Sequence, residues 1–88
     1  MESRLQARII RFVEKSGGFA LKIIRCNKAG FPDLILYFPD DVIYIEVKDK
    51  GKKLDPLQSH RHDELRKYGV FVHTVDNFDE FLEILNFK

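Results

Sequence analysis

The chain has 88 residues, of which 44% are hydrophobic, and a formal net charge of +1. This length suits one small domain with a modest core, so we predict a single domain over residues 1–88. No stretch approaches the ~20 apolar residues that cross a bilayer, and the first residues lack the apolar run of a signal peptide; we therefore expect no membrane partner. The single Cys26 excludes an intrachain disulfide and favours a reducing, cytoplasmic setting.

Charge is distributed unevenly along the chain. Residues 1–75 carry 14 Lys/Arg and 10 Asp/Glu, a balance of +4, whereas residues 76–88 carry one Lys and four Asp/Glu, a balance of −3. If some of the carboxylates bind metal, the remaining surface is more basic than the net charge indicates. We expect the acidic C-terminal segment to face away from any nucleic acid.

Residues 2–15 are predicted to form an amphipathic helix that ends at Gly17-Gly18. Its apolar side carries Leu5, Ile9, Phe12 and Val13, and a second, basic stripe carries Arg4, Arg8, Arg11 and Lys15. The stripe is consistent with a solvated face and equally with contact to phosphates, which needs Lys and Arg in a row but no base specificity.

Residues 19–25 have the composition of a first strand, and residues 33–38 and 42–48 are predicted to form an antiparallel pair of strands. The polar break Pro39-Asp40-Asp41 is typical of the turn between them. Glu46 and Lys48 are two residues apart, so their side chains point to the same face of a strand. The hairpin brings the start of its first strand beside the end of its second, so Asp33 can reach Glu46.

Three charged groups then converge at one corner of the sheet. Two carboxylates at such a distance repel each other, and a bound divalent cation removes that penalty. The ammonium of Lys48 can hold a water or stabilise negative charge developing on a phosphate. The alternative is a structural salt-bridge cluster of Asp33, Glu46 and Lys48 on a solvated face.

The second half of the chain supplies a basic loop and two more helices. Residues 49–56 are polar and include Lys50, Lys52 and Lys53. Asp55-Pro56 is a good helix start, so we predict a helix over residues 56–68, followed by a strand over 70–75 and a helix over 77–86. The apolar residues of the last helix either cover the sheet or pair with a second chain. His60 and His62 do not match a zinc pattern. His60 could approach the site or the DNA, but we predict it to be a surface residue.

The string Gly30-Phe31-Pro32-Asp33-Leu34-Ile35, followed by Glu46-Val47-Lys48 and then Gln58, resembles the VRR-NUC branch of the PD-(D/E)XK nucleases. The resemblance covers almost the whole chain. It implies an α/β fold with the restriction-endonuclease-like core in the order αβββαβα, in which a mixed sheet is flanked by helices.

The resemblance also implies roles for individual residues. Asp33, Glu46 and the carbonyl of Val47 would hold Mg²⁺ or Mn²⁺, and no organic cofactor is expected. Glu2 would support the metal site, Lys48 would position the attacking water or stabilise the transition state, and Gln58 would orient water or substrate.

The predicted partner is DNA, and the predicted activity is metal-dependent endonucleolytic hydrolysis. The candidate nucleic-acid contacts are Arg4, Arg8, Lys28, Lys50, Lys52 and Lys53. Since minimal VRR-NUC proteins resemble Holliday-junction resolvases, we expect a homodimer that cuts four-way junctions. The alternatives are a flap or structure-specific nuclease and a nucleic-acid-binding module of a replication-repair complex.

Overall fold

The structure, a computed structural model, describes residues 2–86 and, for Glu2 and Ser3, the backbone alone. Its elements are α1 (Glu2–Lys15), β1 (Phe19–Lys22), β2 (Leu34–Phe38), β3 (Asp41–Val47), α2 (Pro56–Arg66), β4 (Val72–Val75) and α3 (Phe78–Asn86). The predicted order αβββαβα is confirmed. No helix in the described residues is both long and apolar enough to cross a membrane.

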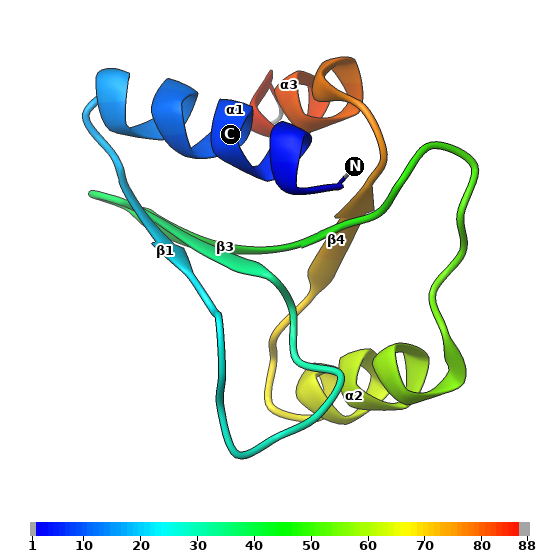
Figure 1. Cartoon of the computed structure of the whole chain (residues 1–88). Coiled ribbons are helices and arrows are strands. Elements are labelled where there is room, and N and C mark those ends of the chain that lie inside the picture. The colour runs from blue at the N-terminus through cyan, green and yellow to red at the C-terminus, as the bar shows by residue number, and fades with distance from the viewer. Residues whose placement is uncertain (1, 87–88) are drawn as a thin grey trace.

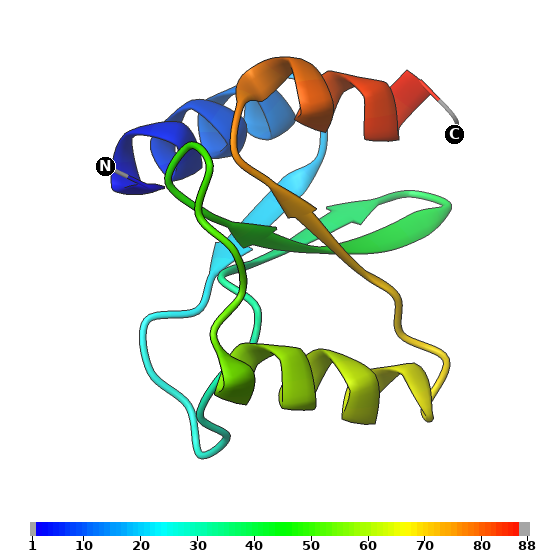
Figure 2. The same ribbon diagram turned by 90° about the vertical axis from the view of Figure 1, so that its right-hand side faces the viewer.

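The four strands form one mixed sheet in the order β1-β2-β3-β4. The first three strands are antiparallel neighbours, and β4 pairs in parallel with β3. A parallel pair needs a crossover connection, and α2 supplies it. Helices α1 and α3 lie together on one side of the sheet, and α2 lies on the other side (Figures 1 and 2).

The hydrophobic core lies between the sheet and the α1–α3 pair. Its fully buried members come from both helices and three strands: Ile9, Val13, Leu34, Leu36, Ile43, Ile45, Val47, Val75 and Phe81. The Phe81 ring packs 5.9 Å from that of Phe12 and 5.6 Å from that of Phe78, measured between centroids. The apolar side of α3 is therefore used within the chain, which favours the interpretation that this helix covers the sheet.

The first strand is shorter than predicted, because it ends at Lys22 rather than at residue 25. The amide of Ile23 still donates to the carbonyl of Asp33 at 2.8 Å. Lys22 pairs with Leu34, the first residue of β2, so β1 ends where its partner strand begins. The predicted bounds of β4 and α2 were also too wide, since β4 begins at Val72 and α2 ends at Arg66.

The side of the sheet that faces α2 is only partly covered. The register places Phe19 opposite Tyr37 and Tyr37 opposite Val42, so these side chains point to one face. We call Phe19, Leu21, Tyr37 and Val42 the open sheet face; their side chains are 60%, 39%, 37% and 45% exposed. Glu46 lies four residues after Val42 on the same strand and therefore points to the same side.

Candidate active site

Asp33 and Glu46 come together because of the register of the β2–β3 hairpin. Leu34 pairs with Ile45, which puts Asp33 next to Glu46 across the two strands. The amide of Val47 donates to Asp33 Oδ2 at 2.9 Å. This bond holds the Asp33 carboxylate beside the end of β3.

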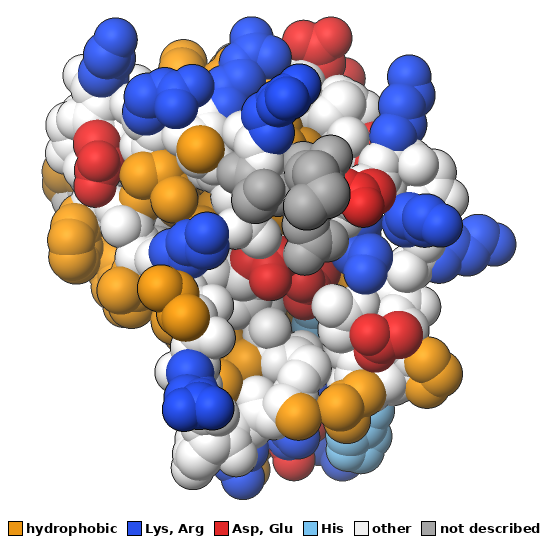
Figure 3. All heavy atoms as spheres, in the orientation of Figure 1, with side chains coloured by type: hydrophobic (Ala, Val, Ile, Leu, Met, Phe, Trp, Pro, Cys, Tyr) orange, Lys and Arg blue, Asp and Glu red, His pale blue; other side chains and the backbone are white. Residues whose placement is uncertain are grey.

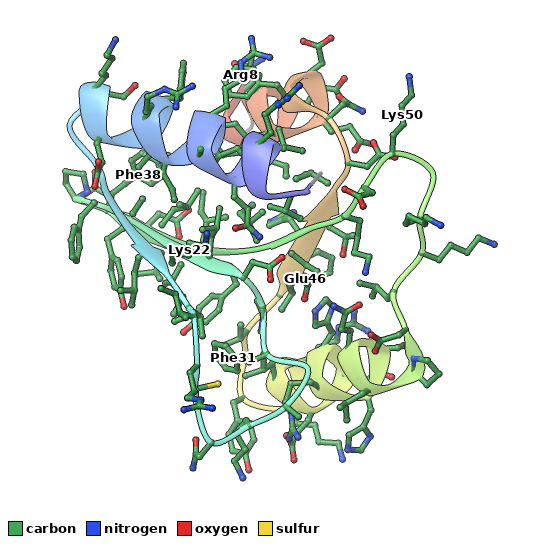
Figure 4. All side chains as sticks on the ribbon, in the orientation of Figure 1. Arg8, Lys22, Phe31, Phe38, Glu46 and Lys50 are labelled. Atoms are coloured by element: carbon green, nitrogen blue, oxygen red, sulfur yellow. The ribbon has the colours of Figure 1, made fainter. Side chains whose placement is uncertain are left out.

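Glu46 is a charged residue in an almost fully buried position, with 1% of its surface exposed. Its side chain points from β3 toward α2 (Figure 4). His62 Nε2 lies 3.1 Å from its Oε1, and the amide nitrogen of Gln58 donates to its Oε2 at 3.4 Å. Because a buried carboxylate is costly without hydrogen-bond partners, these two α2 side chains help to stabilise Glu46 in this position.

Gln58 is held by the start of its own helix. Asp55 and Gln58 form a capping box. The backbone N–H of Gln58 donates to Asp55 Oδ1 at 2.9 Å, and the backbone N–H of Asp55 donates to Gln58 Oε1 at 3.1 Å. The same Oε1 accepts from Lys48 Nζ at 3.2 Å. A local helix-capping motif thus orients one amide between Glu46 and Lys48.

The loop that carries the motif is fixed against the first turn of α2. Gly30 has a φ of +78°, and a Cβ there would lie 2.7 Å from the carbonyl oxygen of Leu57. Arg61 Nε donates to the carbonyl of Ala29 at 2.9 Å. Glycine is required here both for the left-handed backbone and for the close approach, and the contact sets the path of the chain into Asp33.

His62 belongs to this cluster, although sequence reasoning considered only His60 as a histidine that could approach the site. His60 is exposed, whereas His62 is 7% exposed. Burial lowers the pKa of His62 below its usual 6.5, and the charges of Asp63 and Asp33 partly oppose that shift. The missed signal was the spacing from Gln58, because residues four apart share one face of a helix.

The six residues predicted to contact DNA all have exposed side chains, namely Arg4, Arg8, Lys28, Lys50, Lys52 and Lys53. Arg8 also stacks its guanidinium 4.0 Å from the centre of the Phe78 ring. Basic side chains gather over α1 and around the loop between β3 and α2, with acidic side chains between them (Figure 3). The side chain of Glu2 lies outside the described residues.

The cluster offers oxygen ligands to a cation but not a closed cage. Among the described side chains, no three His, Cys, Asp or Glu residues are grouped so that they could hold a metal ion. The neighbouring carboxylates of Asp33 and Glu46, together with the predicted carbonyl ligand of Val47, would make a small, hard donor set. Mg²⁺ is commonly held by one or two carboxylates while it keeps several waters and takes substrate phosphates, so this donor set fits Mg²⁺ and Mn²⁺.

A family model described as the VRR-NUC domain matches residues 2–77. The chain belongs to the VRR-NUC family. A solved structure described as a VRR_NUC domain superposes with a TM-score of 0.85 at 31% identity, over 97% of this chain and 94% of that chain. The chain is also 30% identical over 79 residues to "Putative nuclease p44" of Acyrthosiphon pisum secondary endosymbiont phage 1, covering 89% of this chain and 85% of that protein. This VRR-NUC protein is therefore a nuclease domain.

Proposed function

We propose that this VRR-NUC protein is a divalent-metal-dependent DNA endonuclease and, more specifically, a homodimer that resolves four-way DNA junctions. The observation that carries the nuclease proposal is the convergence of four side chains. Gln58 contacts Lys48 at 3.2 Å and Glu46 at 3.4 Å, and Asp33 lies beside Glu46 across the hairpin. Glu46 is only 1% exposed, which argues against the alternative of a salt-bridge cluster on a solvated face.

Asp33, Glu46 and the Val47 carbonyl would hold Mg²⁺ or Mn²⁺, with Glu2 as a further support. The bound ion would supply charge neutralisation at the scissile phosphate and a water of lowered pKa. Lys48 is half-buried and donates to Gln58, so its ammonium is held at the edge of the site. From there it can orient the attacking water or stabilise negative charge on the phosphate, and Gln58 orients that water or the substrate.

The exposed basic residues named above would bind the DNA backbone. Lys50, Lys52 and Lys53 follow the site directly in the chain, and Arg4 and Arg8 lie on α1. Such contacts give affinity without sequence specificity, as a structure-selective enzyme requires. The phage relative supports a role in phage-type DNA processing, and we accordingly propose the host cytoplasm as the site of action.

The homodimer proposal is supported by the open sheet face. Tyr37 and Val42 line a groove of about 650 Å³ together with Asp40 on one side and Phe71 on the other. Arg66 lies 5.4 Å from the Phe71 ring centre, so an acidic and a basic group flank the same apolar surface. A two-fold axis through this surface would bring Asp40 of one copy toward Arg66 of the other, and such self-complementarity is what a C2 dimer needs.

The dimer is tested by the molar mass of the protein in solution. Wild type should behave as a dimer in light scattering, and Tyr37→Glu should behave as a folded monomer, because a charge in the centre of the apolar contact cannot be desolvated cheaply. Glu83→Lys, an exposed change on α3, is the control. A monomeric wild type, or a dimeric Tyr37→Glu, would reject this interface.

The activity is tested with a labelled four-way junction beside a matched linear duplex and a flap, in Mg²⁺, Mn²⁺ or EDTA. Paired nicks in opposing strands of the junction alone, absent in EDTA and in Glu46→Gln, are the expected result. Equal or better cutting of the flap keeps the nuclease and replaces the junction assignment with a flap-specific one. Binding without cutting in either metal would favour a nucleic-acid-binding module of a replication-repair complex.

A further inference from the structure

The two oxygens of Glu46 are held by different donors. The side-chain nitrogen of Gln58 donates to Oε2 at 3.4 Å, and the side-chain oxygen of the same Gln58 accepts from Lys48. His62 reaches Oε1 at 3.1 Å, and that contact is almost dry, since the two side chains are 8% and 1% exposed. The shorter and better shielded of the two contacts is therefore made by a residue with no part in the mechanism above.

The direction of this hydrogen bond follows from its chemistry. An ionised carboxylate can only accept, so Nε2 of His62 must carry the hydrogen and donate it to Oε1. An ionised carboxylate has about four acceptor sites, so the bond from this one N–H orients Glu46 and does not use up its capacity to bind a cation.

The surroundings explain why orientation matters. Lys48 lies close to Glu46, since both contact the same Gln58 side chain. A Glu46 side chain that could rotate freely would be drawn toward the ammonium of Lys48, and the resulting ion pair would compete with metal binding. The bond from His62 fixes one oxygen and so opposes that rotation.

We propose that His62 is a positioning residue for Glu46: it holds Oε1 so that the remaining lone pairs of the carboxylate are directed, with Asp33, at a divalent cation. This inference rests on the metal-dependent function proposed above. Partners of metal ligands typically change metal affinity about 10- to 100-fold when they are removed.

Substitution of His62 by two different amide side chains separates the effect of the donor nitrogen's position from the effect of side-chain polarity. The amide nitrogen of a glutamine can occupy the place of His Nε2, whereas that of an asparagine lies near the place of Nδ1 and falls short of Glu46. His62→Gln should therefore keep the Mn²⁺ dissociation constant within about threefold of wild type, and His62→Asn should raise it by about tenfold or more. His60→Asn, the same change at an exposed position of α2, should leave it unchanged.

The measurement is calorimetric titration of Mn²⁺ into the metal-free full chain without DNA, with circular dichroism to establish folding. If His62→Asn does not fold, His62→Met takes its place as the variant without a donor. Equal constants for His62→Gln and the donor-free variant overturn the positioning role. A wild-type protein that does not bind Mn²⁺ overturns the metal site itself, so the two failures are distinguishable.

Discussion

The two faces of the sheet have different compositions and different tasks. The face under α1 and α3 contributes only apolar side chains to the core, such as Leu36 and Ile45. At one end, the face toward α2 holds Glu46, which contacts Gln58 and His62. The open sheet face lies at the other end of this same face. Apolar burial stabilises the fold, while a buried carboxylate costs free energy that only hydrogen bonds or a cation can offset. The apolar core and the proposed site of chemistry thus lie on opposite sides of the sheet.

The largest effect is expected on the covered face. Phe81→Ala should lower the free energy of unfolding by about 3–5 kcal/mol, since it empties the centre of the Phe12–Phe78–Phe81 cluster. Phe19→Ala on the open sheet face should change the unfolding free energy of the monomer by no more than about 0.5 kcal/mol. Urea denaturation of both variants in the monomeric Tyr37→Glu background measures both quantities, and comparable losses would mean that the two faces do not differ in this way.

The second prediction concerns the α2 side. Lys48→Met should reduce the rate of DNA cleavage by about 10²- to 10³-fold, because it removes a cation positioned at the developing charge. Since Lys48 is not a metal ligand in the proposed site, the Mn²⁺ dissociation constant should not rise. Single-turnover cleavage and calorimetric titration measure the two quantities. A variant that cuts normally would exclude Lys48 from the chemistry.

The third prediction concerns the contact between the motif loop and α2. Gly30 and Gly51 both have a φ of +78°, but a Cβ at Gly30 would meet the backbone of Leu57 whereas one at Gly51 would meet nothing within 4 Å. Gly30→Ala should therefore destabilise the protein by about 1 kcal/mol or more beyond Gly51→Ala, and it should also slow cleavage through Asp33. Equal melting temperatures for the two variants would show that the loop does not press on α2.

The smallest effect is expected at the basic loop. The Gly51 amide donates to Asp76 Oδ2 at 3.0 Å and, with Asn77, lowers the pKa of the Asp76 carboxyl below its usual 3.8. A carboxyl with a lowered folded-state pKa adds stability above its unfolded pKa, and this is lost as the pH falls through the folded value. Asp76→Asn should slightly flatten the decline of melting temperature below about pH 4. Identical pH profiles would mean that the contact does not contribute.

Much of the architecture could be predicted because it depends on local chemistry. The 3.6-residue spacing of Leu5, Ile9 and Phe12 indicates α1, and the polar break at Pro39-Asp40 separates β2 from β3. Asp55-Pro56 indicates the start of α2, where the structure has its capping box. These signals act within a few residues of the chain and need no partner from elsewhere.

The environment of Glu46 could not be predicted in the same way. The register of the hairpin follows from the turn, so the approach of Asp33 to Glu46 could be anticipated. The burial of Glu46 could not be anticipated, because it depends on where the β3–α2 connection places α2 against the sheet. His62 therefore appeared unremarkable in a polar helix, although Gln58 four residues earlier marked its face.

The sequence by itself determined the order of elements, the hairpin that pairs Asp33 with Glu46, and the position before the motif, Gly30, where the backbone requires a glycine. Each follows from turn chemistry, side-chain periodicity or backbone sterics over short distances. Only the tertiary structure decided that β1 ends at Lys22, that the apolar side of α3 packs within the chain, and that His62 contacts Glu46. Those outcomes depend on segments far apart in the chain, whose meeting is set by packing rather than by any local preference.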